Sequence, residues 1–177
     1  GNAYLMIKFY DEAQEQFEEV LHIDPQHGAT YGCIANCLLA EHLEYEMEMD
    51  NVEEIFSKEK QAIFRDIEKY SAKSIELGDT RQYNYFTNAL ALAYLGMGEK
   101  AYQIILKCDE PIDHNGREIL ADNIARLGLM YIRIKKASLN ARWYLLAAQE
   151  LNSKNPSVGE LESELHLIET SEGDEKA

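Results

Sequence analysis

The sequence predicts an all-α protein in which pairs of antiparallel helices follow one another along the chain. Apolar residues recur at the three- and four-residue spacing of helices, and no stretch alternates as a half-buried strand would. Only three prolines interrupt the 177 residues. A small residue followed three positions later by a tyrosine returns along the chain, which is typical of internal repeats. We therefore expect a single domain over residues 1–170 and a frayed tail over 171–177.

The first 25 residues define the pattern. Gly1 and Tyr4 are followed by Ala13 and Phe17 on the next expected helix, which Pro25 ends. Glycine lets two helices approach closely, the aromatic rings fill the space between them, and alanine leaves room for the rings. Proline cannot donate to the helical ladder and so closes the unit. This order resembles the second part of a tetratricopeptide repeat, a helix–turn–helix unit of 34 residues. The first repeat is therefore expected to be truncated at its N-terminus.

The pattern recurs further along the chain. The small residues equivalent to Gly1 are Ala35, Ala91 and Gly128. The pairs that echo Ala13 and Phe17 are Ala101 with Ile105, and Ala141 with Leu145. The intervals between successive small residues are 34, 56 and 37 residues. The chain thus resembles four tetratricopeptide repeats over about residues 1–155, and this resemblance implies an α–α superhelical solenoid.

The 56-residue interval exceeds 34 by 22, which places an insertion at about residues 42–63 of the second repeat. The sequence gives no helix stop near Ala40 and continues without Gly or Pro. Apolar residues at helical spacing favour about three extra turns on each helix, which would form an antiparallel arm. Asp50 with Glu53, and then Ser57, are expected to cap the helices that follow. The alternative is an acidic disordered loop.

The third and fourth repeats have recognisable boundaries. Thr80 can cap the helix that contains residues 85–94, and Gly96 permits its end. Asp113, together with the proline two residues before it, marks the break before a helix over 117–135. The next helix carries residues 141–151.

The C-terminal part of the domain contains the last two expected helix starts. Ser138 can cap the helix over 141–151, and a final helix is expected over 156–169. That last helix has one apolar face and one Glu-rich face. A repeat array needs a terminal helix of this kind, which covers its open end.

The net charge of −15 is unevenly distributed. Residues 1–60 contain 14 acidic and 3 basic side chains, whereas 61–120 and 121–177 each contain 9 and 7. A negative field repels phosphates, which argues against binding to nucleic acid or to anionic membranes. It favours a basic partner, unless the acidic residues form only a solvated face that keeps the protein soluble through like charge. The acidic arm is expected to offer a second interaction surface, either for such a partner or for self-association, unless it packs back on the array.

The chemistry-bearing residues do not form a recognisable catalytic motif. Cys33, Cys37 and Cys108 have no disulfide or zinc spacing, and we expect them to pack as small apolar residues. Unpaired thiols favour a cytoplasmic location. There is no zinc helix, phosphate loop or nucleophile elbow. We expect no enzyme activity, no cofactor and no metal site.

The resemblance implies a non-catalytic module for protein–protein interaction. In tetratricopeptide proteins the first helix of each repeat lines a concave groove that holds a peptide of the partner. The equivalent positions here are Asn2, Asn36, Leu39, Tyr85, Asn88, Leu95, Arg126 and Arg133. Asparagine amides there are expected to hold the peptide backbone, and the two arginines a carboxylate.

One more specific ligand is excluded by the sequence. Residues 1–4 resemble the first repeat of co-chaperones that clamp the acidic C-terminal tail of chaperones. That clamp needs an asparagine where Cys33 stands, and basic residues where Tyr85 and Ala89 stand. The favoured function is therefore an adaptor for another partner. The alternative is a structural or regulatory assembly segment of a larger polypeptide whose catalytic part lies elsewhere.

Overall fold

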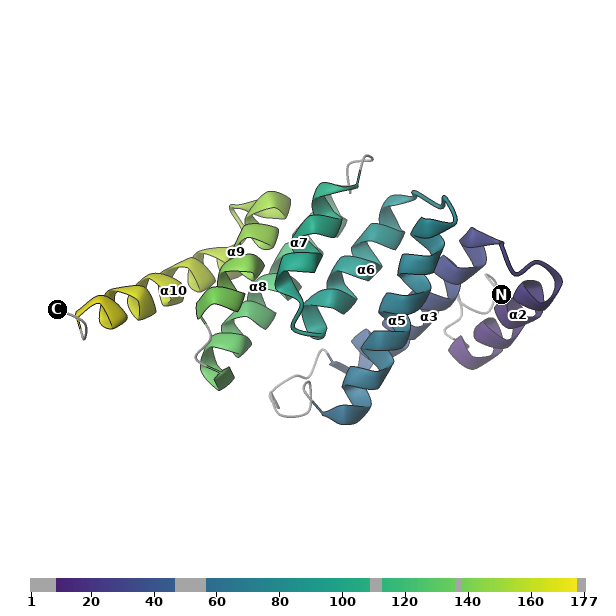
Figure 1. The fold of residues 1–177 in the computed structure, drawn as a ribbon, viewed down its shortest axis with the longest axis horizontal. Helices are drawn as coiled ribbons and strands as arrows, with labels where there is room; N and C mark the ends of the chain where they lie inside the picture. Colours follow the sequence, from purple (N-terminus) through teal and green to yellow (C-terminus); the bar gives the residue numbers. More distant parts are fainter. Residues whose placement is uncertain (1–8, 47–56, 109–112, 136–137, 175–177) are drawn as a thin grey trace.

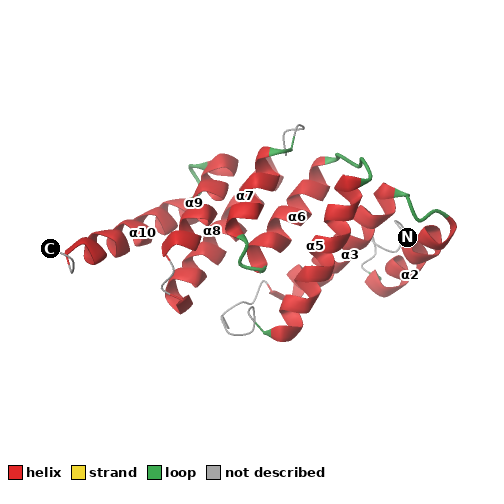
Figure 2. Ribbon diagram, viewed as in Figure 1, coloured by secondary structure: helices red, strands yellow, loops and turns green. Residues whose placement is uncertain are grey.

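All regular elements in the described residues are helices, as the sequence predicts (Figure 2). The computed structural model describes residues 9–46, 57–108, 113–135 and 138–174. The eight helices of these segments are α2 (Tyr10–Ile23), α3 (Gly28–Glu46), α5 (Lys58–Glu76), α6 (Gln82–Tyr94), α7 (Gly98–Leu106), α8 (His114–Lys135), α9 (Ser138–Asn152) and α10 (Pro156–Asp174).

The helices pack largely in the order of the sequence. All the extensive contacts join helices that are neighbours or next-but-one neighbours among those described. Helices α3, α6, α8 and α10 contact one another in succession, and α7 contacts α9. Helices α2 and α10 consequently lie at opposite ends of the long axis of the molecule (Figure 1). Within the described residues no helix combines the length and the apolar content needed to cross a bilayer.

Two clusters of apolar side chains hold the helices together. The larger one joins α3 and every described helix that follows it. The smaller one consists of Ala13, Phe17, Ile34 and Cys37, and it attaches α2 to α3. The predicted burial of Ala13, Phe17 and Cys37 is therefore confirmed, whereas Cys33 is only half-buried.

Close contacts between small and aromatic residues recur along the array, as expected. A Cβ atom added to Gly128 of α8 would lie 2.9 Å from Tyr144 Cβ, and one added to Gly98 would lie 2.9 Å from the Tyr144 ring. The Tyr131 ring stacks on that of Tyr144, with centroids 5.2 Å apart. Tyr94 is likewise buried, and its ring stacks on Phe64 of α5 at 4.0 Å. The small residues thus let neighbouring helices approach the aromatic rings.

Side chains from neighbouring helices satisfy carbonyl groups at helix ends. The amide of Gln61 in α5 donates to the Tyr94 carbonyl at the end of α6 over 2.9 Å. The buried Tyr144 hydroxyl of α9 donates to the carbonyl of Ala93. The guanidinium of Arg117 in α8 donates to the carbonyls of Glu150 and Leu151 in the last turn of α9, both over 2.8 Å. Since terminal carbonyls have no partner within their own helix, these bonds link helices to one another.

One predicted helix cap is confirmed, and a second cap lies at Asp113, which was predicted only as a break between helices. The Ser57 hydroxyl accepts a hydrogen bond from Lys60 N over 3.2 Å at the start of α5. The carboxylate of Asp113 accepts one from Gly116 N over 2.8 Å, so that α8 begins at His114, three residues earlier than predicted. Ser138, which was expected to cap α9, is the first residue of that helix, so this cap is not confirmed.

The prediction that Thr80 caps the third pair is wrong. The residue before α6 is Arg81, whose guanidinium Nε donates to Asp79 Oδ1 over 2.7 Å. The backbone of Arg81 also donates to Asp79, so the carboxylate of Asp79 organises this turn in place of the threonine hydroxyl. At the other end of α6, Gly96 has φ of +77°, which glycine adopts at little cost, and its carbonyl accepts from Asn140 of α9.

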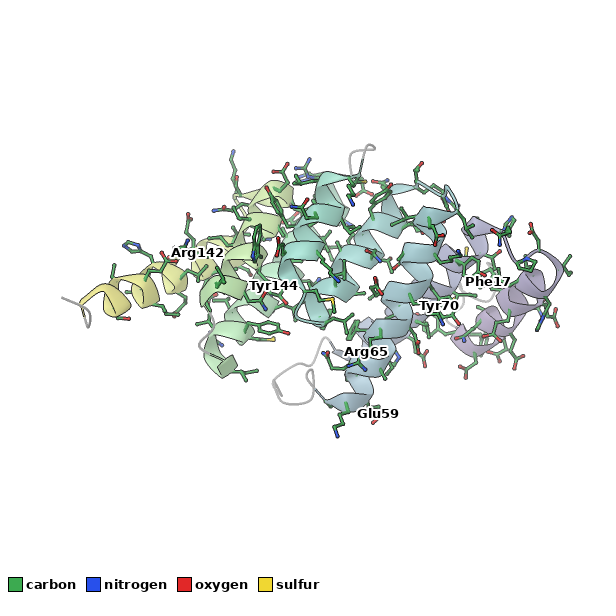
Figure 3. The ribbon with its side chains drawn as sticks, viewed as in Figure 1. Phe17, Glu59, Arg65, Tyr70, Arg142 and Tyr144 are labelled. Carbon is green, nitrogen blue, oxygen red and sulfur yellow. The ribbon has the colours of Figure 1, made fainter. Side chains whose placement is uncertain are left out.

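The described parts of the expected insertion extend α3 to Glu46 and start α5 at Lys58. Each of these helices has 19 residues, compared with 13 in α6 and 9 in α7. The side chain of Ile63 packs against the main core, and that of Gln61 binds α6. Residues 61–63 of the expected insertion therefore lie against neighbouring helices, whereas the start of α5, at Glu59, extends beyond the end of α6 (Figure 3). The predicted cap at Asp50 and the tip of the arm lie outside the described residues.

The final helix is longer than expected. Helix α10 continues to Asp174, past the predicted end at Glu169 and into the segment expected to be frayed. Its inner face buries Val158, Leu161 and Leu165 against α8 and α9. Its sides are held by ion pairs from Arg142 to Glu169, at 2.6 Å, and from Arg133 of α8.

Candidate partner-binding surface

Three of the predicted groove residues lie in contacts between α3, α5 and α6. The amide of Asn88 is 1% exposed and donates to Glu68 O over 3.1 Å and to Ser71 Oγ over 2.9 Å. Asn36 Oδ1 accepts from Thr87 Oγ1 over 2.6 Å. Leu39 is buried in the main core. The amide of Asn88 is therefore not available to a peptide backbone, and the carbonyl oxygen of Asn36 is already bonded within the array.

Two further predicted groove residues belong to α6, which is enclosed by its neighbours. Tyr85 is buried, and Leu95 packs against the core just after the helix. Ten of the thirteen residues of α6 are buried, because α3, α5, α7 and α8 all pack against it. The prediction that Leu39, Tyr85 and Asn88 face a groove is therefore corrected. The burial of α6 was indicated by the alternating Ala and Leu residues at 89–93, because apolar residues on every face of a helix indicate that the helix is buried.

The two predicted arginines lie on the surface of α8. Arg126 Nε is 2.8 Å from Asp122 Oδ2 on the same helix. Arg133 Nη2 is 3.5 Å from Glu160 Oε1 on α10. Both guanidinium groups are thus exposed and already paired with a carboxylate. Exposed pairs of this kind contribute about 0–1 kcal/mol, because water screens them.

Aliphatic side chains accompany the arginines on the same face of α8. Ile119 is 45% exposed and Ile134 is 46% exposed, although both are large and apolar. The half-buried Met130 lies one helical turn before Ile134. Positions 119, 126, 130, 133 and 134 share one side of a helix at 3.6 residues per turn. We refer to Ile119, Arg126, Met130, Arg133 and Ile134 as the α8 stripe. Sequence analysis found its arginines but missed its isoleucines, which helical spacing from Arg126 could have identified.

Burial and hydrogen bonding shift the pKa values of several described side chains. Burial raises the pKa of the Cys37 thiol to about 11, and burial also raises that of Cys33. The hydrogen bond from Arg81 lowers the pKa of Asp79 to about 2. Among the described residues, no three His, Cys, Asp or Glu side chains gather as they would around a metal ion. Of the predicted groove residues, Arg126 and Arg133 of the α8 stripe are exposed, and Asn2 lies outside the described residues.

The chain was compared with known proteins. No protein-family model matches it, and no curated protein does. A functional assignment consequently depends on the residues and the geometry described above.

Proposed function

We propose that the chain is a tetratricopeptide-type α–α superhelical solenoid that binds a partner protein without catalysing a reaction. Three features support this fold: the sequential packing of helices, the recurring contacts between small and aromatic residues, and a final helix with one apolar face. In such an array the scaffold is constant, and the exposed side chains determine which partner binds.

The observation that carries the proposal is the α8 stripe. Exposed isoleucines beside two arginines suit a partner segment that has aliphatic side chains next to a carboxylate. A guanidinium binds a carboxylate through two parallel hydrogen bonds. The bound carboxylate would replace Asp122 or Glu160, and the exchange costs little because both existing pairs are exposed. The stripe thus provides an apolar contact and an anion contact on one rigid helix.

The proposal is tested by selecting peptides from a random display library on the immobilised protein. Peptides that bind are then measured by fluorescence anisotropy against the wild type and against Arg126→Ala, Arg133→Ala and Ile134→Ser. We expect each substitution to weaken binding by about fivefold to tenfold, the loss of one charge-assisted or apolar contact. The matched control is Arg65→Ala, which removes an exposed arginine from α5.

Two results would contradict the proposal. One is that selection enriches no peptide from the library. The other is that the enriched peptides bind all variants as tightly as they bind the wild type. Far-ultraviolet circular dichroism shows whether each variant keeps its helices, so that a loss of affinity is not confused with a loss of folding.

One observation favours the alternative, an assembly segment of a larger polypeptide. Leu139 and Leu146 are exposed on one side of α9, with the half-buried Trp143 between them. A permanent neighbour would cover such an apolar strip. If this role is correct, the isolated chain associates at high concentration in sedimentation experiments, and Leu139→Glu with Leu146→Glu abolishes the association. Purely monomeric behaviour of the wild type would count against this role.

A further inference from the structure

A hollow of about 610 Å³ lies between α2 and α5, beside the start of α3. Leu21 of α2, Tyr31 of α3 and Tyr70 of α5 provide its apolar lining. Its volume is that of a site for a small ligand or for one or two side chains of a partner. None of these residues belongs to the α8 stripe, so the hollow is a separate feature of the surface.

The two tyrosines form a fixed aromatic wall. Their ring centroids are 6.3 Å apart, and the ring planes differ by 28°. The Tyr31 hydroxyl donates to the carbonyl of Pro25 over 3.1 Å, which holds that ring in place. The Tyr70 ring packs against both core clusters. A ligand would therefore meet a surface that is already ordered.

Negative charge surrounds the Tyr70 ring. The pKa of the Tyr70 hydroxyl is raised first by burial and then by the negative charges of Glu18 and Asp66. Glu68 and Glu76 of α5 line the hollow, together with Lys69 and Lys73. The lining itself therefore has two carboxylates and two ammonium groups, and the excess of negative charge near the Tyr70 ring comes from Glu18 and Asp66, which do not line the hollow. That excess argues against an acidic ligand.

The position of Lys69 indicates that the Tyr70 ring can hold a cationic group. Lys69 Nζ lies over the Tyr70 ring, 5.8 Å from its centroid, within the range of a cation–π interaction. The ammonium group of Lys73 instead forms an ion pair with Glu76, at 3.1 Å. The carboxylate of Glu18 accepts a hydrogen bond from Gln14 over 3.0 Å and has no cationic partner among the described residues.

We propose that the hollow binds an arginine or lysine side chain from a basic segment of a partner protein. The aliphatic stem of that side chain lies against Leu21 and Tyr31. Its cationic group takes the place of Lys69 over the Tyr70 ring and pairs with Glu18. Arginine fits best, because a guanidinium can stack on a ring and bind a carboxylate at the same time.

The charge of the neighbouring helix supports a basic partner. Helix α2 carries five acidic residues and no Lys or Arg. Its field raises the rate at which a positively charged segment arrives, and salt reduces this effect. The α8 stripe attracts carboxylates by contrast, so the two surfaces select different ligands. The proposed site at the hollow stands independently of the function proposed for α8.

The probe is a fluorescein-labelled peptide that contains two arginines separated by leucine, together with the same peptide in which citrulline replaces arginine. Citrulline keeps the shape of arginine but has no charge. Binding is measured by fluorescence anisotropy at low and at physiological salt. We expect the arginine peptide to bind and the citrulline peptide to bind at least about tenfold more weakly.

Two pairs of surface variants separate the hollow from the diffuse field of the protein. Glu18→Gln and Glu19→Gln remove the same charge from adjacent positions, and each carboxylate accepts a hydrogen bond from a glutamine. Only Glu18 acts on Tyr70. We expect Glu18→Gln to weaken binding about threefold to tenfold and Glu19→Gln to have less than half that effect.

The second pair tests the displacement of the intramolecular cation. Lys69→Ala and Arg65→Ala each remove one positive charge from α5, but only Lys69 lies over the Tyr70 ring. We expect Lys69→Ala to strengthen binding of the arginine peptide about threefold more than Arg65→Ala does. Tyr70→Leu is expected to abolish the difference between these two variants.

Several outcomes would overturn the proposal. Equal effects within both pairs would show that only the overall charge matters. Absence of binding up to about 1 mM arginine peptide would exclude the site, since even a weak specific complex is detected there. Association of the protein with itself that Tyr70→Leu removes would show that a second copy occupies the hollow instead. If Tyr70→Leu fails to fold, the two pairs of exposed variants still decide the question.

Discussion

The Tyr144 hydroxyl provides a direct test of the links between helices. Tyr144→Phe removes the hydrogen bond from α9 to the carbonyl of Ala93 and leaves the ring in place against Tyr131. The carbonyl of Ala93 keeps a second donor, because Gly96 N also bonds to it over 3.0 Å. The substitution therefore leaves the carbonyl of Ala93 with one partner, and it also removes the hydrogen bond between the Tyr144 and Tyr131 side chains.

Because the carbonyl of Ala93 keeps a partner, the expected loss of stability is that of a hydrogen bond and not that of an unsatisfied buried group. A hydrogen bond of this kind contributes about 1 kcal/mol to stability, whereas an unsatisfied buried group costs about 1–3 kcal/mol. We expect Tyr144→Phe to lower the free energy of unfolding by about 1 kcal/mol, which lowers the melting temperature of a protein of this size by about 2–4 °C.

The assay is urea unfolding followed by circular dichroism. An unchanged slope of the free energy of unfolding against urea concentration shows that only stability has changed. Tyr102→Phe is the control, because the Tyr102 ring is half-buried against Trp143 and its hydroxyl makes no hydrogen bond to another described residue. We expect that control to change stability by less than about 0.5 kcal/mol. Equal losses in the two variants would refute the argument that the hydroxyl of Tyr144 links α9 to α6.

Four further variants test the packing and the loop. Gly128→Ala should cost about 1–3 kcal/mol in urea unfolding, because the added Cβ would lie 2.7 Å from Leu161, whereas Gly159→Ala, with nothing within 4 Å, should be neutral or stabilising. Asp79→Asn should remove a pH-dependent part of stability. The folded-state pKa of Asp79, about 2, lies below its usual 3.8, so its contribution is complete above 3.8 and is lost as the pH falls towards 2; thermal melts across this range measure the difference. Phe17→Ala should cost about 3–5 kcal/mol, as for other buried aromatic residues, and a loss below about 1 kcal/mol would mean that α2 contributes little to the fold.

The local pattern of the sequence was sufficient to predict which residues pack between helices. Ala13, Phe17, Gly128 and Tyr131 could be found because spacing along a helix decides which face they occupy. The all-α class follows from the same periodicity. The N-cap at Ser57 was also predictable, since a cap depends on residues only three positions apart.

The groove residues could not be assigned in the same way. Whether Tyr85 and Asn88 face solvent depends on how many helices pack around α6, and that number is a property of the tertiary structure. In a sequence, an asparagine usually indicates a surface position. The amide of Asn88 is nevertheless buried, because it donates hydrogen bonds to Ser71 and to a carbonyl of α5. The hollow depends on the position of α2 relative to α5, which no local pattern specifies. The end of α10 was missed because the sequence after Glu169 contains no strong helix stop.

The bonds from α9 to α6 bear on how the array opens under native conditions. In a stack where each repeat contacts only the next, the end repeats can unfold one at a time. Here Tyr144 and Asn140 of α9 donate to carbonyls at and just after the end of α6, three helices earlier in the chain. Opening of α9 would break both bonds, so amide protons in the last turn of α6 should exchange with solvent together with those of α9. Helix α2, attached through the small cluster around Phe17, should exchange sooner and independently.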